Sequence, residues 1–299
     1  MTINDQNLEA MGLISRLLQA DQPLFAPEEV HHFAQDTGLD EHNAFCMLIA
    51  AACGLEIDHH AHHLRLAQQY LFPALKRLEP QAYTGNPYYR LLKTAGLRQG
   101  AWRLTRQSYA PYQVFPCGNT VLLPDGRTLP RLGYFETAFS YPALLENGRE
   151  WMTVTPNEIE TMADDIAAAH GRMAVLGLGL GYFAFMASNK PEVTGITVVE
   201  RSADVIALFR QRLLPLFPHG DKITLVRADA FEFIESTKAS YDFIYADLWH
   251  DVADGLPLYL RLKGMAAKAP AQWRYWIEPD MLIFLNGLAA DPETRSMLL

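Results

Sequence analysis

A run of closely spaced glycines within an apolar stretch constrains the fold of this chain more than any other feature. Residues 173–176 are apolar enough for a buried parallel strand. Gly177, Gly179 and Gly181 follow and form a turn without side chains, where a ligand can approach the backbone. The alanine-rich residues 182–188 predict a helix whose free N-terminal amides face the same turn. The pattern is typical of the first half of a nucleotide-binding βαβ unit.

Acidic residues follow the next strands of the predicted sheet. A second apolar run, at 193–199, ends in Glu200, whose carboxylate is placed to accept hydrogen bonds from two ribose hydroxyls. Asp229 and Asp247 stand where two later strands are expected to end. Because open α/β sheets bind ligands at the carboxyl ends of their strands, these acids and the glycine turn are expected to converge. The alternative is that each acid caps a helix or faces solvent.

The composition is that of a globular protein without a membrane segment. The 299 residues are 49% hydrophobic and 20% charged, and no apolar run reaches the ~18 residues of a membrane helix. Residues 1–7 are polar and acidic, unlike a signal peptide. Cys46, Cys53 and Cys117 are too scattered for a disulfide framework or a zinc site, which favours a cytoplasmic location. The net charge of −9 disfavours nucleic acid as a partner.

The sequence divides into three parts with different patterns. Residues 1–99 have apolar residues at helical spacing and predict an N-terminal all-α region. Residues 100–150 predict a small β extension, with a hairpin turn at 124–127. Its strands are expected at 101–109, 113–115, 120–123 and 132–141. Residues 151–299 alternate between strand and helix patterns and form the predicted binding domain.

The last part predicts an α/β fold with a doubly wound, mainly parallel sheet. A capping box from Thr155 to Glu158, with proline between them, predicts a helix that runs to about Ala169. Strands are expected at 173–178, 194–199, 223–227, 242–247 and 273–278. Helices are expected at 181–188, 202–213, 229–236, 256–267 and 280–289.

Several of these segments resemble the S-adenosylmethionine-dependent methyltransferase superfamily. Residues 175–181 resemble its first motif, Glu200 its ribose-binding acid, and residues 228–230 its adenine-recognising turn. Within the superfamily, residues 221–234 and 240–247 are similar to the third and fourth strands of spermidine synthases, the aminopropyltransferases. The resemblance implies a Rossmann-like fold and S-adenosylmethionine, or its decarboxylated form, as cofactor. The cofactor-binding residues that it implies are Gly177, Gly179, Gly181, Glu200, Arg201, Asp229 and Ala230.

The chain also departs from these families at the positions that hold the donor's amino group. Aminopropyltransferases carry an aspartate inside the glycine turn, where this chain has Leu180. Methyltransferases often carry an acid at the position of Gly177. The sequence therefore favours adenosyl binding and leaves the transferred group open.

The segment after the fourth strand is the candidate catalytic region. The resemblance places a catalytic aspartate at Asp247, where a carboxylate can orient an amine and accept its proton. Trp249, His250 and Asp251 follow as candidate substrate residues, and Tyr141 lies in a segment that is similar to an upstream substrate-side motif. The alternative is that Asp247 caps the following turn and Trp249 packs in the core.

Two other kinds of site are disfavoured. A dinucleotide fingerprint requires glycine at the sixth position from Gly177, where Tyr182 stands. His59 and His63 share a helical face, but no second ligand pair accompanies them, so no metal site is expected.

The sequence as a whole favours an S-adenosylmethionine-dependent methyltransferase that acts on a small molecule or a protein side chain. The first alternative is a spermidine-synthase-like aminopropyltransferase that uses decarboxylated S-adenosylmethionine. The second is a non-catalytic adenosyl-binding interaction module. The expected partner is the acceptor itself, without nucleic acid or membrane, and a homodimer is left open.

Overall fold

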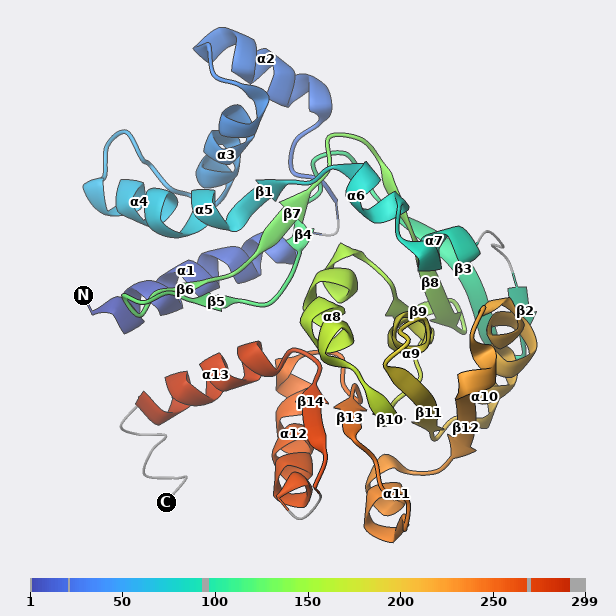
Figure 1. Cartoon of the computed structure of the whole chain (residues 1–299). Helices are drawn as coiled ribbons and strands as arrows, with labels where there is room; N and C mark the ends of the chain where they lie inside the picture. The colour runs from blue at the N-terminus through green and yellow to red at the C-terminus, as the bar shows by residue number, and fades with distance from the viewer. Residues whose placement is uncertain (1, 21, 93–96, 268–269, 291–299) are drawn as a thin grey trace. The chain divides into compact units, whose positions relative to one another are not determined.

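The fold was analysed in a computed structural model of the whole chain, which describes residues 2–20, 22–92, 97–267 and 270–290 (Figure 1). The chain forms two compact units that interleave along the sequence. The first comprises Met1–Thr84, Ser108–Ser140 and Ile283–Leu299, and the second comprises Gly85–Gln107 and Tyr141–Leu282. The predicted boundaries after residues 99 and 150 stay predictions.

The first unit is mainly helical at its N-terminal end. Its elements are α1 (Ile3–Leu18), α2 (Pro27–Thr37), α3 (Glu41–Ala52), α4 (Ala61–Leu66), the π-helical turn η1 (Ala67–Leu71), α5 (Phe72–Ala74), β1 (Leu75–Arg77) and α6 (Pro80–Thr84). The helices bury one continuous apolar cluster that includes Phe45, Ile49 and Tyr70. Residues of the β extension, Tyr112 and Tyr134, belong to the same cluster. The helical spacing of the sequence therefore reflects one shared core.

A short strand interrupts the region that was expected to be all-helical. β1 pairs in parallel with β7 (Leu132–Tyr134), and β7 pairs antiparallel with β4 (Phe115–Pro116). Leu75 is fully buried there. The expectation is wrong at these three residues because their conformation depends on a partner strand almost sixty residues away, which local periodicity does not show. It is also wrong at β2 (Leu97–Gln99), which pairs antiparallel with β3 (Trp102–Tyr109). The predicted hairpin turn is confirmed between β5 (Val121–Leu122) and β6 (Thr128–Leu129).

The second unit contains a five-stranded parallel sheet, which confirms the predicted fold class. The strand order is β12-β11-β10-β13-β14, and every neighbouring pair is parallel. The strands are β10 (Gly171–Leu176), β11 (Val193–Glu200), β12 (Ile223–Arg227), β13 (Phe243–Ala246) and β14 (Gln272–Tyr275). All five strands begin within about two residues of their predicted first residues.

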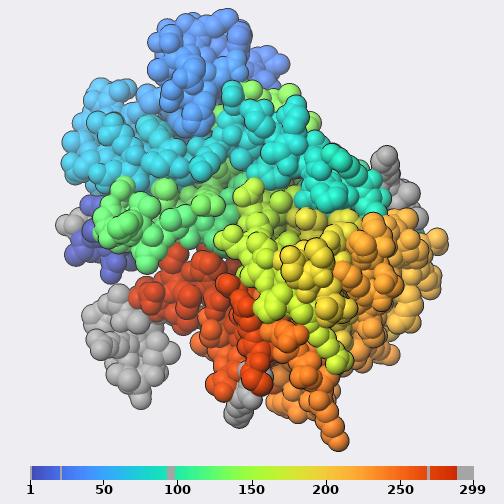
Figure 2. All heavy atoms as spheres, in the orientation of Figure 1, coloured from blue at the N-terminus to red at the C-terminus, as the bar shows by residue number. Residues whose placement is uncertain are grey.

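Helices alternate with these strands as predicted. They are α8 (Pro156–Ala168), α9 (Tyr182–Ser188), α10 (Ala203–Leu208) with the turns η2 (Phe209–Leu213), η3 (Leu214–Leu216) and η4 (Gly220–Lys222), α11 (Ala230–Ser236), α12 (Val252–Ala266) and α13 (Glu278–Ala290). The capping box starts α8 at Pro156, as expected. α8 and α9 pack side by side and are adjacent on the face shown in Figure 2, in yellow-green and yellow. Within the described ranges no helix has the length and apolarity needed to span a bilayer.

A four-stranded sheet precedes α8 in the chain. Its order is β2-β3-β8-β9, with β2 (Leu97–Gln99), β3 (Trp102–Tyr109), β8 (Phe139–Glu146) and β9 (Arg149–Thr153). β9 was not expected from the sequence. It pairs antiparallel with β8 and leads directly into α8.

The order of the parallel strands defines where a ligand can enter. The chain runs from β10 outward to β11 and β12, then returns to the other side of β10 to form β13 and β14. The connections on the two sides of β10 therefore leave in opposite directions. In open α/β sheets this switch point opens a crevice at the carboxyl ends of the strands, here those of β10 and β13.

Candidate functional site

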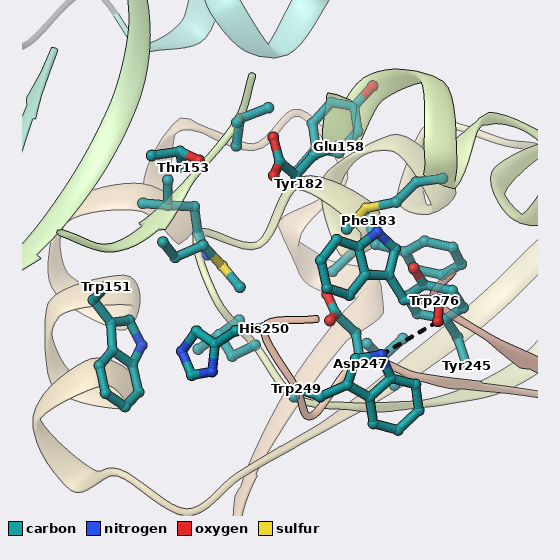
Figure 3. Close-up of a pocket in the computed structure, with 18 of the residues that line it drawn as sticks. Trp151, Thr153, Glu158, Tyr182, Phe183, Tyr245, Asp247, Trp249, His250 and Trp276 are labelled. Atoms are coloured by element: carbon teal, nitrogen blue, oxygen red, sulfur yellow. Dashed lines mark hydrogen bonds between the residues drawn. The ribbon is translucent and has the colours of Figure 1, made fainter. Parts of the chain in front are cut away.

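A cavity of about 200 Å³ occupies this crevice (Figure 3). Its walls come from β9, the first half of α8, the glycine turn after β10, the start of α9 and the segment after β13. All of these elements belong to the second unit. The cavity is therefore formed by one compact part of the chain.

The cavity is acidic. Glu150, Glu158 and Asp247 line it, whereas no lysine or arginine does so among the described residues. Burial raises the pKa of both glutamates, and the charge of Glu150 adds to the rise at Glu158. Carboxylates held together away from water favour a cationic ligand, because a positive charge offsets both their desolvation and their mutual repulsion.

Asp247 is the most perturbed of these acids. Its backbone nitrogen donates to the carbonyl of Leu176 at 2.9 Å, which fixes the residue at the end of β13. Burial, with the charge of Glu158, raises the pKa of its side chain from 3.8 to about 7. No group in the described part of the chain forms a hydrogen bond with this carboxyl. An acid that titrates near neutrality and has free oxygens is suited to accept a proton.

Glu158 is a cavity residue that the sequence did not reveal. One of its oxygens, Oε2, accepts hydrogen bonds from the backbone nitrogen of Thr155, at 2.7 Å, and from the Thr155 hydroxyl. The capping box accounts for the glutamate at this position completely, so the sequence gives no signal of a second role. Only the placement of α8 beside the crevice brings Glu158 to the cavity.

Aromatic side chains complete the walls. Tyr245 is fully buried, and its ring stacks on Phe183 with 3.7 Å between centroids. Its hydroxyl has no hydrogen-bond partner among the described residues. Trp249 is also buried, and its indole nitrogen donates to the backbone carbonyl of Trp276 at 3.3 Å. Trp249 thus both packs and lines the cavity, which combines the two alternatives for this residue.

The glycine turn is held closely by other parts of the protein. A Cβ atom on Gly177 would lie 2.0 Å from the carbonyl oxygen of Asp247, and one on Gly179 would lie 1.8 Å from the sulfur of Met152. Both glycines, and Gly181, have positive φ angles of 97°, 50° and 76° respectively. Conformation and packing by protein atoms therefore explain the glycines. The close approach of a ligand to the turn stays a prediction.

Two tyrosines of α7 (Pro87–Leu91) hold opposite walls of the cavity. The Tyr88 hydroxyl donates to the carbonyl of Leu180 in the glycine turn, and the Tyr89 hydroxyl donates to the carbonyl of Val154, just before α8. Tyr88 is fully buried. Because both carbonyls are bonded to one short helix, the glycine turn and the start of α8 are fixed relative to each other.

The predicted nucleoside-binding acids lie at strand ends but outside the cavity lining. Glu200 accepts from the backbone nitrogens of Ser202, at 2.7 Å, and Leu178, at 3.3 Å, so it links the end of β11 to the glycine turn. Asp229 caps α11 through its Oδ1 atom, which accepts from two backbone nitrogens. Each carboxylate keeps acceptor capacity for a ligand. Ala230 is buried at the start of α11, and Arg201 is exposed.

The predicted substrate residues are brought together only in part. His250 lines the cavity, and its Nδ1 atom pairs with Asp254 at 3.1 Å. Asp251 caps α12 and does not line the cavity. Tyr141 is buried in β8 outside the lining, although burial and the charges of Glu150 and Glu158 raise its pKa to about 12.

The absence of a metal site stays a prediction. His62 pairs with Glu9 at 2.9 Å, and His60 pairs with Glu56 at 3.0 Å. In the described part of the chain no three metal-binding side chains come together.

The strand order and the crevice define a Rossmann-like α/β protein. No family model matches the chain, and no curated protein matches it. A spermidine synthase from Thermotoga maritima is 15% identical over 46% of this chain and 53% of its own, with a TM-score of 0.32. A putative O-methyltransferase from Klebsiella pneumoniae is 18% identical over 46% of this chain and 70% of its own, with a TM-score of 0.30.

A precorrin-6y C5,15-methyltransferase from Geobacter metallireducens is 22% identical over 31% of this chain and 49% of its own, with a TM-score of 0.26. The chain thus spans about half the length of the spermidine synthase and of the precorrin methyltransferase. At such low identity and TM-score, the fold class rests on the strand order itself.

Proposed function

We propose that this protein is an S-adenosylmethionine-dependent transferase, and that it methylates an amine on a small molecule or a protein side chain. The observation that carries the proposal is the position of Asp247. Its buried carboxyl ends a central strand and lines the same cavity as the glycine turn. A proton acceptor beside a nucleoside-binding turn is what transfer from a sulfonium to an amine requires.

Each of the candidate site residues has a distinct role in the proposed reaction. Glu200 would hold the ribose, and Asp229 with Ala230 would border the adenine. When bound, S-adenosylmethionine supplies the electrophilic methyl group. Asp247 would orient the acceptor amine for in-line attack and accept the proton that the amine loses as the N–C bond forms and the S–C bond to the methyl group breaks, with S-adenosylhomocysteine as the leaving group. The aromatic side chains of Tyr245 and Trp249 exclude water and provide ring faces for a cation.

A second candidate function is aminopropyl transfer from decarboxylated S-adenosylmethionine. The observation that favours it is the acidic cavity, with three carboxyl groups and no basic side chain among the described lining residues, because a polyamine carries several positive charges. Leu180 stands against it, since the aspartate of the aminopropyltransferases is missing from the glycine turn.

A third candidate is a non-catalytic adenosyl-binding module. The absence of a donor-tail acid at Leu180 and Gly177 leaves it open. Met152 also covers the glycine turn, since its sulfur accepts from the backbone nitrogen of Leu180 at 3.2 Å. A turn that is occupied by a side chain of the same protein needs that side chain to move before a ligand can reach it.

Ligand binding and turnover separate these candidates. Binding is measured by calorimetry with S-adenosylmethionine, its decarboxylated form and NADH, and transfer to a panel of amines is followed by mass spectrometry. We expect S-adenosylmethionine to bind and an N-methylated product to form. Preference for the decarboxylated form supports aminopropyl transfer, binding without any transfer supports the third candidate, and binding of NADH alone contradicts all three.

Asp247→Asn then tests the proposed base. It should abolish turnover and spare cofactor binding, because the amide keeps the shape of the side chain but cannot accept the proton. Asp221→Asn is the matched control, since Asp221 is exposed and does not line the cavity. Unchanged turnover in Asp247→Asn would remove this residue as the base.

A further inference from the structure

The cavity holds a second carboxyl group, on Glu158, that the proposed reaction does not use. Its Oε2 atom is occupied by the backbone nitrogen and the hydroxyl of Thr155. Its Oε1 atom forms no hydrogen bond with any other described residue. Figure 3 shows Glu158 at the cavity, with Asp247 on another part of its wall. Capping α8 therefore uses one oxygen of Glu158 and leaves the other for a ligand.

The charge of Glu158 acts on Asp247 within the cavity. The charge of Glu158 is one of the two causes that raise the pKa of Asp247, after burial. Two carboxyl groups in a confined, partly dry space are unfavourable unless a cation lies between them or one is protonated. Because the described lining contains no lysine or arginine, a cation in this space comes from a ligand, and without a ligand the raised pKa of Asp247 lets that carboxyl hold a proton.

The hydroxyl of Tyr245 points independently to a ligand in the same place. Tyr245 is 0% exposed, lines the cavity and is held by its stack on Phe183. Its hydroxyl has no partner among the described residues, although it lies near enough to Asp247 for that charge to raise its pKa. A buried hydroxyl without a partner has lost its hydrogen bond to water, and a ligand that hydrogen-bonds to it restores that interaction.

The glycine turn shows what is missing from the cavity. Leu180 and Gly177 occupy the two positions where an acid could hold a donor's amino group, and both line the cavity together with Glu158. We propose that Glu158 supplies the carboxylate that binds a primary ammonium group in this cavity, in place of the acid absent from the turn. The inference rests on the proposed function for the nature of the donor, and the ammonium group belongs either to the donor's amino acid tail or to the acceptor amine.

Glu158→Gln tests the charge of this side chain without removing the cap, because glutamine also completes a capping box. Glu160→Gln is the matched control, since Glu160 lies on the same helix, is exposed and does not line the cavity. Calorimetry on the full chain measures three probes: S-adenosylhomocysteine, which has a primary ammonium group; methylthioadenosine, which lacks one; and 1,3-diaminopropane.

We expect Glu158→Gln to lower the affinity for one ammonium probe by at least about tenfold, the usual effect of losing a charge-assisted hydrogen bond. The affinity for methylthioadenosine should stay unchanged. Weaker binding of S-adenosylhomocysteine would show that Glu158 holds the ammonium group of the donor. Weaker binding of 1,3-diaminopropane would show that it holds the acceptor amine. Equal affinities of the variant and the wild type for both ammonium probes overturn the inference. An equal loss of affinity for methylthioadenosine also overturns the inference, because it would reflect a damaged cavity.

The same data distinguish the inference from the proposed function. If adenosyl probes bind and Glu158→Gln changes none of the three affinities, the inference fails and the proposed function stands. If 1,3-diaminopropane binds in a Glu158-dependent way and no adenosyl probe binds, the ammonium site stands and the proposed function fails. No binding of any probe to the wild type overturns both.

Discussion

The sulfur of Met152 accepts a hydrogen bond from the backbone nitrogen of Leu180 at 3.2 Å and lies against Gly179. Met152 comes from β9 and Leu180 from the glycine turn, so the contact joins the two sheets of the second unit. It places a flexible, partly buried side chain on the backbone that a nucleoside cofactor is expected to approach.

Met152→Ala should therefore tighten adenosyl binding. If the side chain must leave the turn before a cofactor binds, its removal raises the competent fraction, and the affinity for S-adenosylhomocysteine rises on the order of threefold to tenfold. The lost packing costs about 1–3 kcal/mol of stability. Calorimetry and urea unfolding measure the two effects.

Met162→Ala is the control for this change. Met162 is buried and lines the same cavity from α8, so its removal enlarges the cavity without uncovering the glycine turn. Tighter binding in both variants, or in neither, would mean that Met152 does not restrict access to the turn.

Gly179→Ala should destabilise the protein by more than about 2 kcal/mol. Its φ of 50° lies in the left-handed region, which costs an alanine about 1–2 kcal/mol, and the new Cβ would collide with Met152. In the double variant with Met152→Ala, the loss of stability caused by the collision should disappear, and the loss caused by the left-handed backbone should remain. Urea unfolding measures both.

Gly195→Ala provides the comparison, since a Cβ there meets no atom within 4 Å. Its stability should stay within about 1 kcal/mol of the wild type. A Gly179→Ala protein as stable as Gly195→Ala would show that the turn adapts to a side chain.

Asp247 should make the stability of the ligand-free protein fall between about pH 4 and pH 7. Its pKa is about 7 in the folded state against 3.8 for an ordinary aspartate, so over this range the folded state keeps a proton that the unfolded state has lost. The penalty is complete above pH 7 and amounts to at most about 4 kcal/mol. Asp247→Asn should flatten the fall, as followed by urea unfolding across pH.

In Asp247→Asn the free energy of unfolding should still fall somewhat with rising pH. The reason is that burial also raises the pKa of Asp165 to about 6 and raises the pKa of Glu158. The pH dependence of turnover has the opposite direction to that of stability. Since only ionised Asp247 accepts a proton, kcat/KM should rise with pH towards about 7 and then level off. Identical pH profiles of stability for wild type and Asp247→Asn would contradict the raised pKa.

Glu200→Ala should weaken adenosyl binding by about 1–3 kcal/mol if the carboxylate holds the ribose through charge-assisted hydrogen bonds. Methylthioadenosine is the probe, because it has the ribose and lacks the amino acid tail. Glu192→Ala, an exposed position before the same strand, is the control. An affinity equal to that of the control would show that the end of β11 does not contact the nucleoside.

The parallel sheet could be predicted because its signals are local. The inner strands are short apolar runs, and several helices begin at a polar cap, such as Thr155 before α8 and Asp229 before α11. β1 was missed because its conformation depends on a partner strand almost sixty residues away. The unexpected β9 pairs with the adjacent β8 across a turn at Asn147 and Gly148, both at positive φ, so its signal was local: an Asn-Gly pair is typical of a hairpin.

The sequence by itself determined the α/β alternation, the glycine turn and the acids at the ends of the strands, because these follow from periodicity and local backbone chemistry. Tertiary structure alone decided which groups share the cavity. Glu158 has a sufficient local reason in its capping box, and Met152 lies in a strand that periodicity did not predict. Burial and the approach of two carboxyl groups also set the pKa of Asp247, and such perturbations arise only when segments far apart in the chain exclude water together.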